Sequence, residues 1–101
     1  MREQQVLLQA CEQHCPAGSV ISLFGSRVDN ERRGGDIDLL IETPMALSAA
    51  EEVAIRGRFL ASVWRALGES RIDLIFTSSE RMDSRPVVTV ARAHAIRLEA
   101  S

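Results

Sequence analysis

A chain of 101 residues, 46% of them hydrophobic and 26% charged, can form one domain with one core and leaves little room for a second. Its net charge of -2 gives no electrostatic reason to expect general nucleic-acid binding, although all 12 basic residues are arginines. No apolar run approaches the roughly 18 residues of a membrane span, and the polar start of the chain does not resemble a signal peptide. We therefore expect a single cytoplasmic domain over residues 1–101.

The first part of the chain predicts one helix followed by two strands. Residues 2–14 carry apolar side chains at helical spacing, and the Pro-Ala-Gly sequence at 16–18 ends this helix. Residues 20–24 and 37–41 are short apolar runs typical of strands. The second of these strands is broken at Pro44.

The longest predicted helix begins at Ser48 and ends before Gly68. Ser48 and Glu51 have the spacing of a capping box. Gly57 costs such a helix about 1 kcal/mol relative to alanine, so we expect close packing at this position. Its predicted buried stripe consists of Val53, Leu60, Val63, Trp64 and Leu67, widened by Ile55 and Phe59.

The remaining predicted elements are a strand, a helix and a short last strand. Residues 71–76 form the strand, the helix runs from about Pro86 to Ala93, and residues 95–98 form the final strand. Strands that alternate with helices in this way indicate an α/β or α+β two-layer sandwich.

Two aspartates open the second predicted strand, and a third lies inside the next strand. Asp36 and Asp38 are two positions apart, so their side chains leave the same face. If Asp73 lies on a neighbouring strand, three carboxylates converge and repel one another. A divalent cation removes this repulsion, and oxygen ligands without His or Cys favour Mg²⁺ or Mn²⁺ over Zn²⁺. The opposite face, toward the helices, is predicted to carry Ile37, Leu39, Ile41, Ile72, Leu74 and Phe76.

The Gly-Ser turn before this strand supplies the other half of a phosphate site. Gly25 allows the backbone to approach a ligand closely, and a helix capped by Ser26 would direct free N–H groups at an anion. Arg27, beside the turn, is a candidate phosphate contact, whereas Arg32 and Arg33 either hold a triphosphate or solvate the loop. A phosphate-binding turn beside a carboxylate-bound metal pair is equipped for phosphoryl or nucleotidyl transfer.

Gly25-Ser26, nine intervening residues, Asp36 and Asp38, and the later Asp73 together resemble the signature of the polymerase-β-like nucleotidyltransferases. The short chain is similar to the minimal nucleotidyltransferases, the antitoxin partners of HEPN-domain toxins, over nearly its whole length. The resemblance implies a nucleotidyltransferase fold, with a small mixed sheet and helices on one face. It also implies nucleotide phosphates at the Gly-Ser turn and two Mg²⁺ ions on the three aspartates, with Asp73 helping to activate the nucleophile.

The function implied by this resemblance is transfer of AMP from Mg-ATP to a hydroxyl. Because a domain this small has no second domain for an acceptor, a partner would supply it, and the family points to a tyrosine of a HEPN toxin. One alternative is an inactive antitoxin that neutralises its partner by binding alone, which the short gap between Ser26 and Asp36 favours. Another is transfer to a small molecule or an RNA end, which the acidic net charge does not support.

The two cysteines are also candidate metal ligands. Cys11, His14 and Cys15 have the i, i+3, i+4 spacing of a helix face and could offer soft ligands to zinc. We favour buried, reduced thiols and an exposed His14, because no fourth ligand is evident and Cys packs as a small hydrophobe. We expect His94 to be structural and Glu42 to be a surface charge at a strand end.

Overall fold

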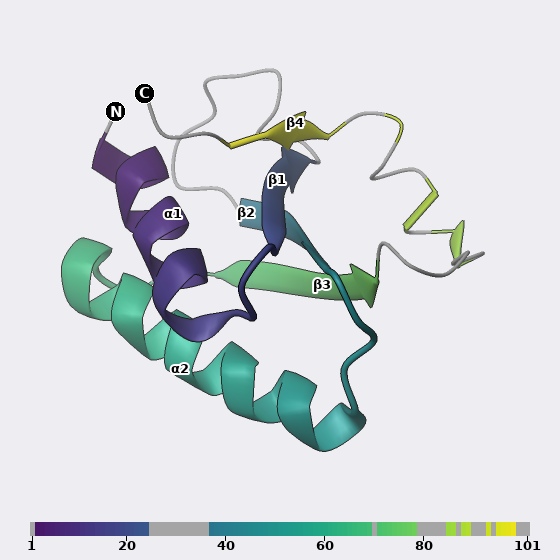
Figure 1. Ribbon diagram of the computed structural model, residues 1–101. Helices are drawn as coiled ribbons and strands as arrows, with labels where there is room; N and C mark the ends of the chain where they lie inside the picture. The colour runs from purple at the N-terminus through teal and green to yellow at the C-terminus, as the bar shows by residue number, and fades with distance from the viewer. Residues whose placement is uncertain are drawn as a thin grey trace.

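The computed structural model describes residues 2–24, 37–69, 71–78, 85, 86, 88, 89, 93 and 95–98. Two helices and four strands follow one another within these residues (Figure 1): α1 (Arg2–His14), β1 (Val20–Phe24), β2 (Ile37–Thr43), α2 (Ala49–Leu67), β3 (Ile72–Ser78) and β4 (Ile96–Arg97).

The four strands form one mixed sheet in the order β3-β2-β1-β4. β1 is antiparallel to both β2 and β4, whereas β2 and β3 are parallel. A parallel pair requires a crossover connection, and α2 provides it. Both helices pack on the same side of the sheet (Figure 1), which confirms the predicted two-layer α+β sandwich with a mixed sheet.

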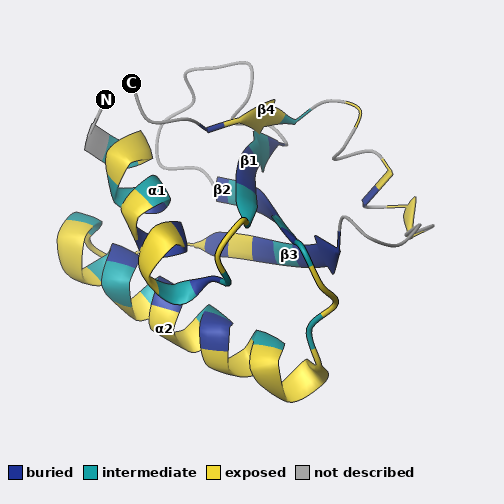
Figure 2. Cartoon of the chain, in the orientation of Figure 1, coloured by how far each residue is buried: buried dark blue, intermediate teal, exposed yellow. Residues whose placement is uncertain are grey.

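The core lies between the helices and the sheet. Apolar side chains alternate along β2 and β3 as predicted, and those directed at the helices are buried (Figure 2). Each such side chain contributes about 1.5–3 kcal/mol of hydrophobic stabilisation. The buried residues of this cluster include Leu7, Ala10 and Cys11 from α1, Ile37, Leu39 and Ile41 from β2, Ile55, Phe59 and Val63 from α2, and Ile72, Leu74 and Phe76 from β3.

The buried face of α2 differs from the predicted stripe. Ile55, Phe59 and Val63 are its buried residues, one turn apart from each other. Val53, predicted to be core, is 66% exposed. It stands two positions before Ile55, which is about 200° around the helix, so both cannot face the sheet. The other predicted members of the stripe are partly buried at its margin: Leu60, Trp64 and Leu67.

Both ends of α2 are capped as the sequence predicts. The Ser48 hydroxyl accepts a hydrogen bond from the Glu51 N–H at 3.1 Å, and the Glu51 carboxylate accepts one from the Ser48 N–H at 2.8 Å. Gly68 ends the helix with φ of 91°, and its N–H donates to the Trp64 carbonyl. Gly57, by contrast, is exposed, with no atom within 4 Å of the position that a Cβ would take, so the predicted close packing is wrong.

β2 and β3 each extend two residues beyond their last predicted apolar position. The parallel ladder continues to the pair Thr43 and Ser78, whose side chains are 1% and 2% exposed. The Thr43 hydroxyl donates to the Met45 carbonyl at 2.6 Å, so burial costs it no hydrogen bond. Polar residues that find such partners can prolong a buried strand past the end of its apolar run.

The C-terminal part follows the prediction where it is described. Pro86, Val88, Thr89 and Ala93 are helical, and the Thr89 N–H donates to the Arg85 carbonyl at 3.1 Å. The short last strand is β4, which pairs with β1. Neither α1 nor α2, the two helices of the described part, has the length and apolar character needed to cross a bilayer.

Candidate active site

Two of the three predicted acidic residues stand side by side on the sheet. Asp38 of β2 and Asp73 of β3 are direct partners in the parallel register, and neighbouring strands lie about 4.8 Å apart. Both alternate with the core residues of their strands, so their side chains leave the face turned away from α1 and α2. Asp38 is half-buried and Asp73 is exposed. The fold therefore brings these two carboxylates together on the face opposite the helices.

The last residue of β1 lies next to Asp38 of β2 in the sheet. β1 runs antiparallel to β2, and its last residue, Phe24, is the register partner of Asp38. The predicted phosphate-binding turn starts at the next residue of the chain, Gly25. On the other side, the Ile37 N–H donates to the Arg71 carbonyl at 3.0 Å, which aligns the starts of β2 and β3. The topology thus places the last residue of β1 beside Asp38.

Four of the six predicted site residues lie outside the described residues. They are Gly25, Ser26, Arg27 and Asp36, so the predicted N-cap, the phosphate contacts and the third carboxylate remain predictions. Asp36 directly precedes Ile37, the first residue of β2. Arg32, Arg33 and His94 also fall outside the described part.

A small apolar cluster borders the acidic pair and was not predicted. Leu40 follows Asp38 on the same face of β2, yet it is only 1% exposed, and it packs with Phe24 and Ile75. The signal was present in the sequence, because consecutive apolar residues at 39 and 40 indicate a strand covered on both faces. The carboxylates therefore have an apolar surface on one flank, which lowers the local dielectric around any charge placed there.

Two arginines that the sequence analysis did not single out hold β3 in place. β3 is an edge strand, and unpaired carbonyls on an edge invite wrong pairing. Arg56 of α2 donates to the Leu74 carbonyl at 3.1 Å, and its guanidinium lies 5.3 Å from the centre of the Phe76 ring. Arg85 donates to the Phe76 carbonyl at 2.7 Å. These contacts stabilise the strand that carries Asp73.

The donor set of the site suits a hard cation. Carboxylates directly opposite on neighbouring strands repel each other, and oxygen ligands of this kind favour Mg²⁺ over Zn²⁺. Within the described ranges, no group of three or more His, Cys, Asp or Glu side chains is arranged to hold a metal ion. Asp38 and Asp73 are two of the three predicted ligands, and the third, Asp36, lies outside those ranges.

The structure confirms the predicted burial of the two cysteines but not the predicted exposure of His14. Cys11 and Cys15 are buried free thiols, as expected, whereas His14 is half-buried rather than exposed. Cys11 borders a cavity of about 640 Å³ between α1 and the β1–β4 side of the sheet, which does not include the acidic pair.

Comparison with known proteins yields no relative: no protein-family model matches the chain, and no curated protein matches it at a significant level. The functional argument therefore rests on the residues and their geometry.

Proposed function

We propose that this chain is a minimal nucleotidyltransferase that transfers AMP from Mg-ATP to a hydroxyl of a partner protein. The observation that carries the proposal is the register of the sheet, which sets Asp38 directly opposite Asp73 on the face away from the helices. The end of β1, which directly precedes Gly25 in the sequence, also lies beside Asp38 and supports the same proposal.

The roles of the residues follow from their positions. Asp36, Asp38 and Asp73 would hold two Mg²⁺ ions, and Gly25, Ser26 and Arg27 would bind the nucleotide phosphates. Bound Mg²⁺ supplies charge stabilisation for the attacking and leaving oxygens. Asp73 is exposed on an edge strand, so it is the acid that an incoming acceptor reaches first, and it orients the attacking hydroxyl.

The reaction is a substitution at the α-phosphorus. The acceptor oxygen forms the new P–O bond, the bond to the β-phosphate breaks, and pyrophosphate leaves while the hydroxyl loses its proton. The apolar flank of Leu40 and Phe24 excludes water from one side of the acidic pair, which strengthens electrostatic interactions there.

The acceptor we propose is a HEPN toxin, modified on a tyrosine, with the chain acting as its cytoplasmic antitoxin. Asp73 is exposed on the sheet face opposite α1 and α2 (Figure 1), so a partner can approach it without displacing either helix. Modification and steric masking would both silence the toxin.

The test combines the purified chain, Mg²⁺, ATP labelled on the α-phosphate and a purified HEPN-domain protein as the candidate partner. We expect label on that partner with the wild type and at least a 100-fold loss, roughly 2.7 kcal/mol of transition-state stabilisation, with Asp38→Asn/Asp73→Asn. Glu12→Gln is the matched control, because it removes an exposed carboxylate from α1 and should leave transfer unchanged.

The other outcomes discriminate between the alternatives. Partner binding without label, unaffected by the double substitution, would show an antitoxin that acts by binding alone. Label on an RNA end or on a small molecule, with none on the partner, would show that the acceptor is not a protein.

A further inference from the structure

A pair of thiols at the end of α1 is independent of the acidic site. Cys11 lies in the last turn of α1, and Cys15 follows its last residue, His14. The Cys15 N–H donates to the Cys11 carbonyl at 2.9 Å, which extends the helical turn to Cys15. The two side chains are therefore one turn apart on the same side of the helix, and their thiols are hydrogen-bonded to each other.

The hydrogen bond makes the two thiols chemically different. Donation from the Cys15 thiol stabilises the Cys11 thiolate and lowers the pKa of Cys11, although burial opposes this shift. The pKa of Cys15 is raised, because its thiol donates this hydrogen bond and is also buried. A thiolate is the reactive form of cysteine, so Cys11 is the better nucleophile of the two.

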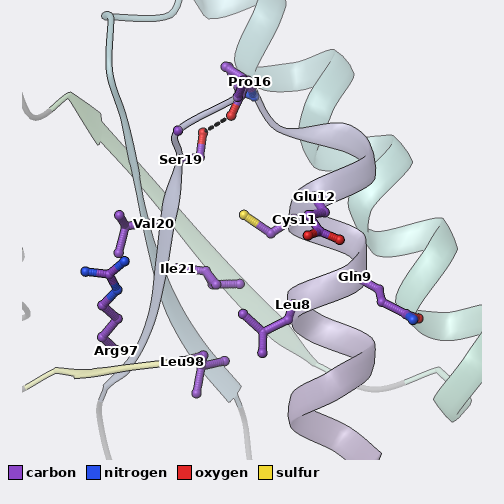
Figure 3. Close-up of a pocket in the computed structure, with 12 residues that line it drawn as sticks. Leu8, Gln9, Cys11, Glu12, Pro16, Ser19, Val20, Ile21, Arg97 and Leu98 are labelled. Atoms are coloured by element: carbon purple, nitrogen blue, oxygen red, sulfur yellow. Dashed lines mark hydrogen bonds between the residues drawn. The ribbon is translucent and has the colours of Figure 1, made fainter. Parts of the chain in front are cut away.

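Cys11 also borders the larger of the two cavities beside the thiols. Its sulfur points from α1 into the space of about 640 Å³ that separates the helix from β1 and β4 (Figure 3). The lining mixes apolar side chains with polar ones: Leu8, Ile21, Leu98, Glu12, Ser19 and Arg97. Cys15 borders a different cavity of about 280 Å³, between the end of α1 and α2. A small polar molecule can therefore reach Cys11 without unfolding of the core.

We propose that Cys11 and Cys15 form a peroxide-oxidisable dithiol site, in which Cys11 reacts with a small peroxide in the cavity and Cys15 resolves the product to an intrachain disulfide. This site is separate from the proposed nucleotidyl transfer and does not depend on it.

Both steps balance. The Cys11 thiolate attacks one peroxide oxygen, the O–O bond breaks, and the sulfur is oxidised to a sulfenic acid as the peroxide is reduced. The Cys15 sulfur then attacks the Cys11 sulfur, the S–S bond forms, and the S–O bond breaks. The departing hydroxide takes the Cys15 proton and leaves as water. The net change is the loss of two hydrogen atoms from the protein.

Bridging requires a local movement that the position of Cys15 permits. Cβ atoms one turn apart on a helix are about 5–6 Å from each other, whereas a disulfide needs about 3.5–4.5 Å. Because Cys15 lies beyond the last residue of α1, the movement distorts its terminal hydrogen bond to Cys11 and shifts its packing at the edge of the core, while the hydrogen bonds within α1 stay in place.

The first experiment treats the whole reduced chain with hydrogen peroxide, and peptide mass mapping follows under non-reducing conditions. We expect the loss of both free thiols, a monomer lighter by two hydrogen atoms, and a bridge between the peptides of Cys11 and Cys15. An unchanged thiol content, a stable single-oxygen adduct on the wild type, or a disulfide-linked dimer would overturn the proposal. All of these measurements use the wild-type chain.

Single substitutions then assign the order of attack. In Cys15→Ala the sulfenic acid cannot be resolved, so dimedone should trap it on Cys11. Cys11→Ala is the matched control and should give much less adduct on Cys15, because burial still raises the pKa of the remaining thiol, which borders the smaller cavity. Trapping on Cys15 but not on Cys11 would refute the assigned roles.

Discussion

Replacing Asp73 with asparagine should separate the stability of the fold from its capacity to bind metal. Asp73 is exposed and is the register partner of Asp38, so the substitution keeps the shape of the side chain and removes one of two facing carboxylates. In the absence of metal, the substitution relieves the repulsion between the two carboxylates. In the presence of Mg²⁺, the substitution removes a predicted ligand.

The size of the repulsion follows from the register, and the size of the Mg²⁺-dependent stabilisation follows from mass action. Unit charges about 5 Å apart repel by about 0.8 kcal/mol at the dielectric constant of water, and like charges directly opposite on a sheet are destabilising. For a domain of this size, 1 kcal/mol corresponds to about 4–8 °C in Tm. Asp73→Asn should therefore raise Tm by about 3–6 °C in EDTA. Mg²⁺ at about ten times its Kd should raise the Tm of the wild type by about 6–11 °C.

Differential scanning fluorimetry in EDTA and across a Mg²⁺ titration measures both effects. The wild type should respond to Mg²⁺ and Asp73→Asn should respond weakly or not at all. Glu12→Gln removes the same charge from α1 and should retain the full response. A lower Tm for Asp73→Asn in EDTA, together with an undiminished Mg²⁺ response, would refute the reasoning, because it would mean that Asp73 stabilises the fold and ligates nothing.

Three further predictions concern the scaffold, each measured as the free energy of unfolding in urea. Gly57→Ala should stabilise the chain by about 0.5–1 kcal/mol, because the site is exposed with open space around it, and a destabilised variant would show that the glycine meets a neighbour after all. Ser48→Ala should cost about 0.5–2 kcal/mol by removing the acceptor for the Glu51 N–H, whereas Ser48→Asp, which restores that acceptor, should cost much less. Phe59→Ala should cost about 3–5 kcal/mol, because Phe59 is fully buried under the sheet, and a loss below 1 kcal/mol would contradict the packing of α2.

The sequence alone predicted the helices and strands closely. The bounds of α1 and β1 were predicted to the residue, and the capping box of α2 formed as expected. Helical spacing, caps and strand alternation are short-range signals, since each depends on residues within about one turn or one pleat of each other. The same alternation correctly assigned Asp38 and Asp73 to the face away from the helices.

The tertiary structure decided which of these elements meet, and in what alignment. Nothing local aligned Asp38 with Asp73, since a shift of one residue in the β2–β3 register would send the two side chains to opposite faces. The local spacing of apolar residues also did not determine the rotation of α2, in which packing buried Phe59 and left Val53 exposed. It gave no sign that Arg56 and Arg85 donate hydrogen bonds to carbonyls of β3. The sequence thus determined the elements and the faces of their side chains. The register, the helix rotation and the pairing of the two aspartates arose from packing between distant segments, where burial of the shared core outweighs local preference.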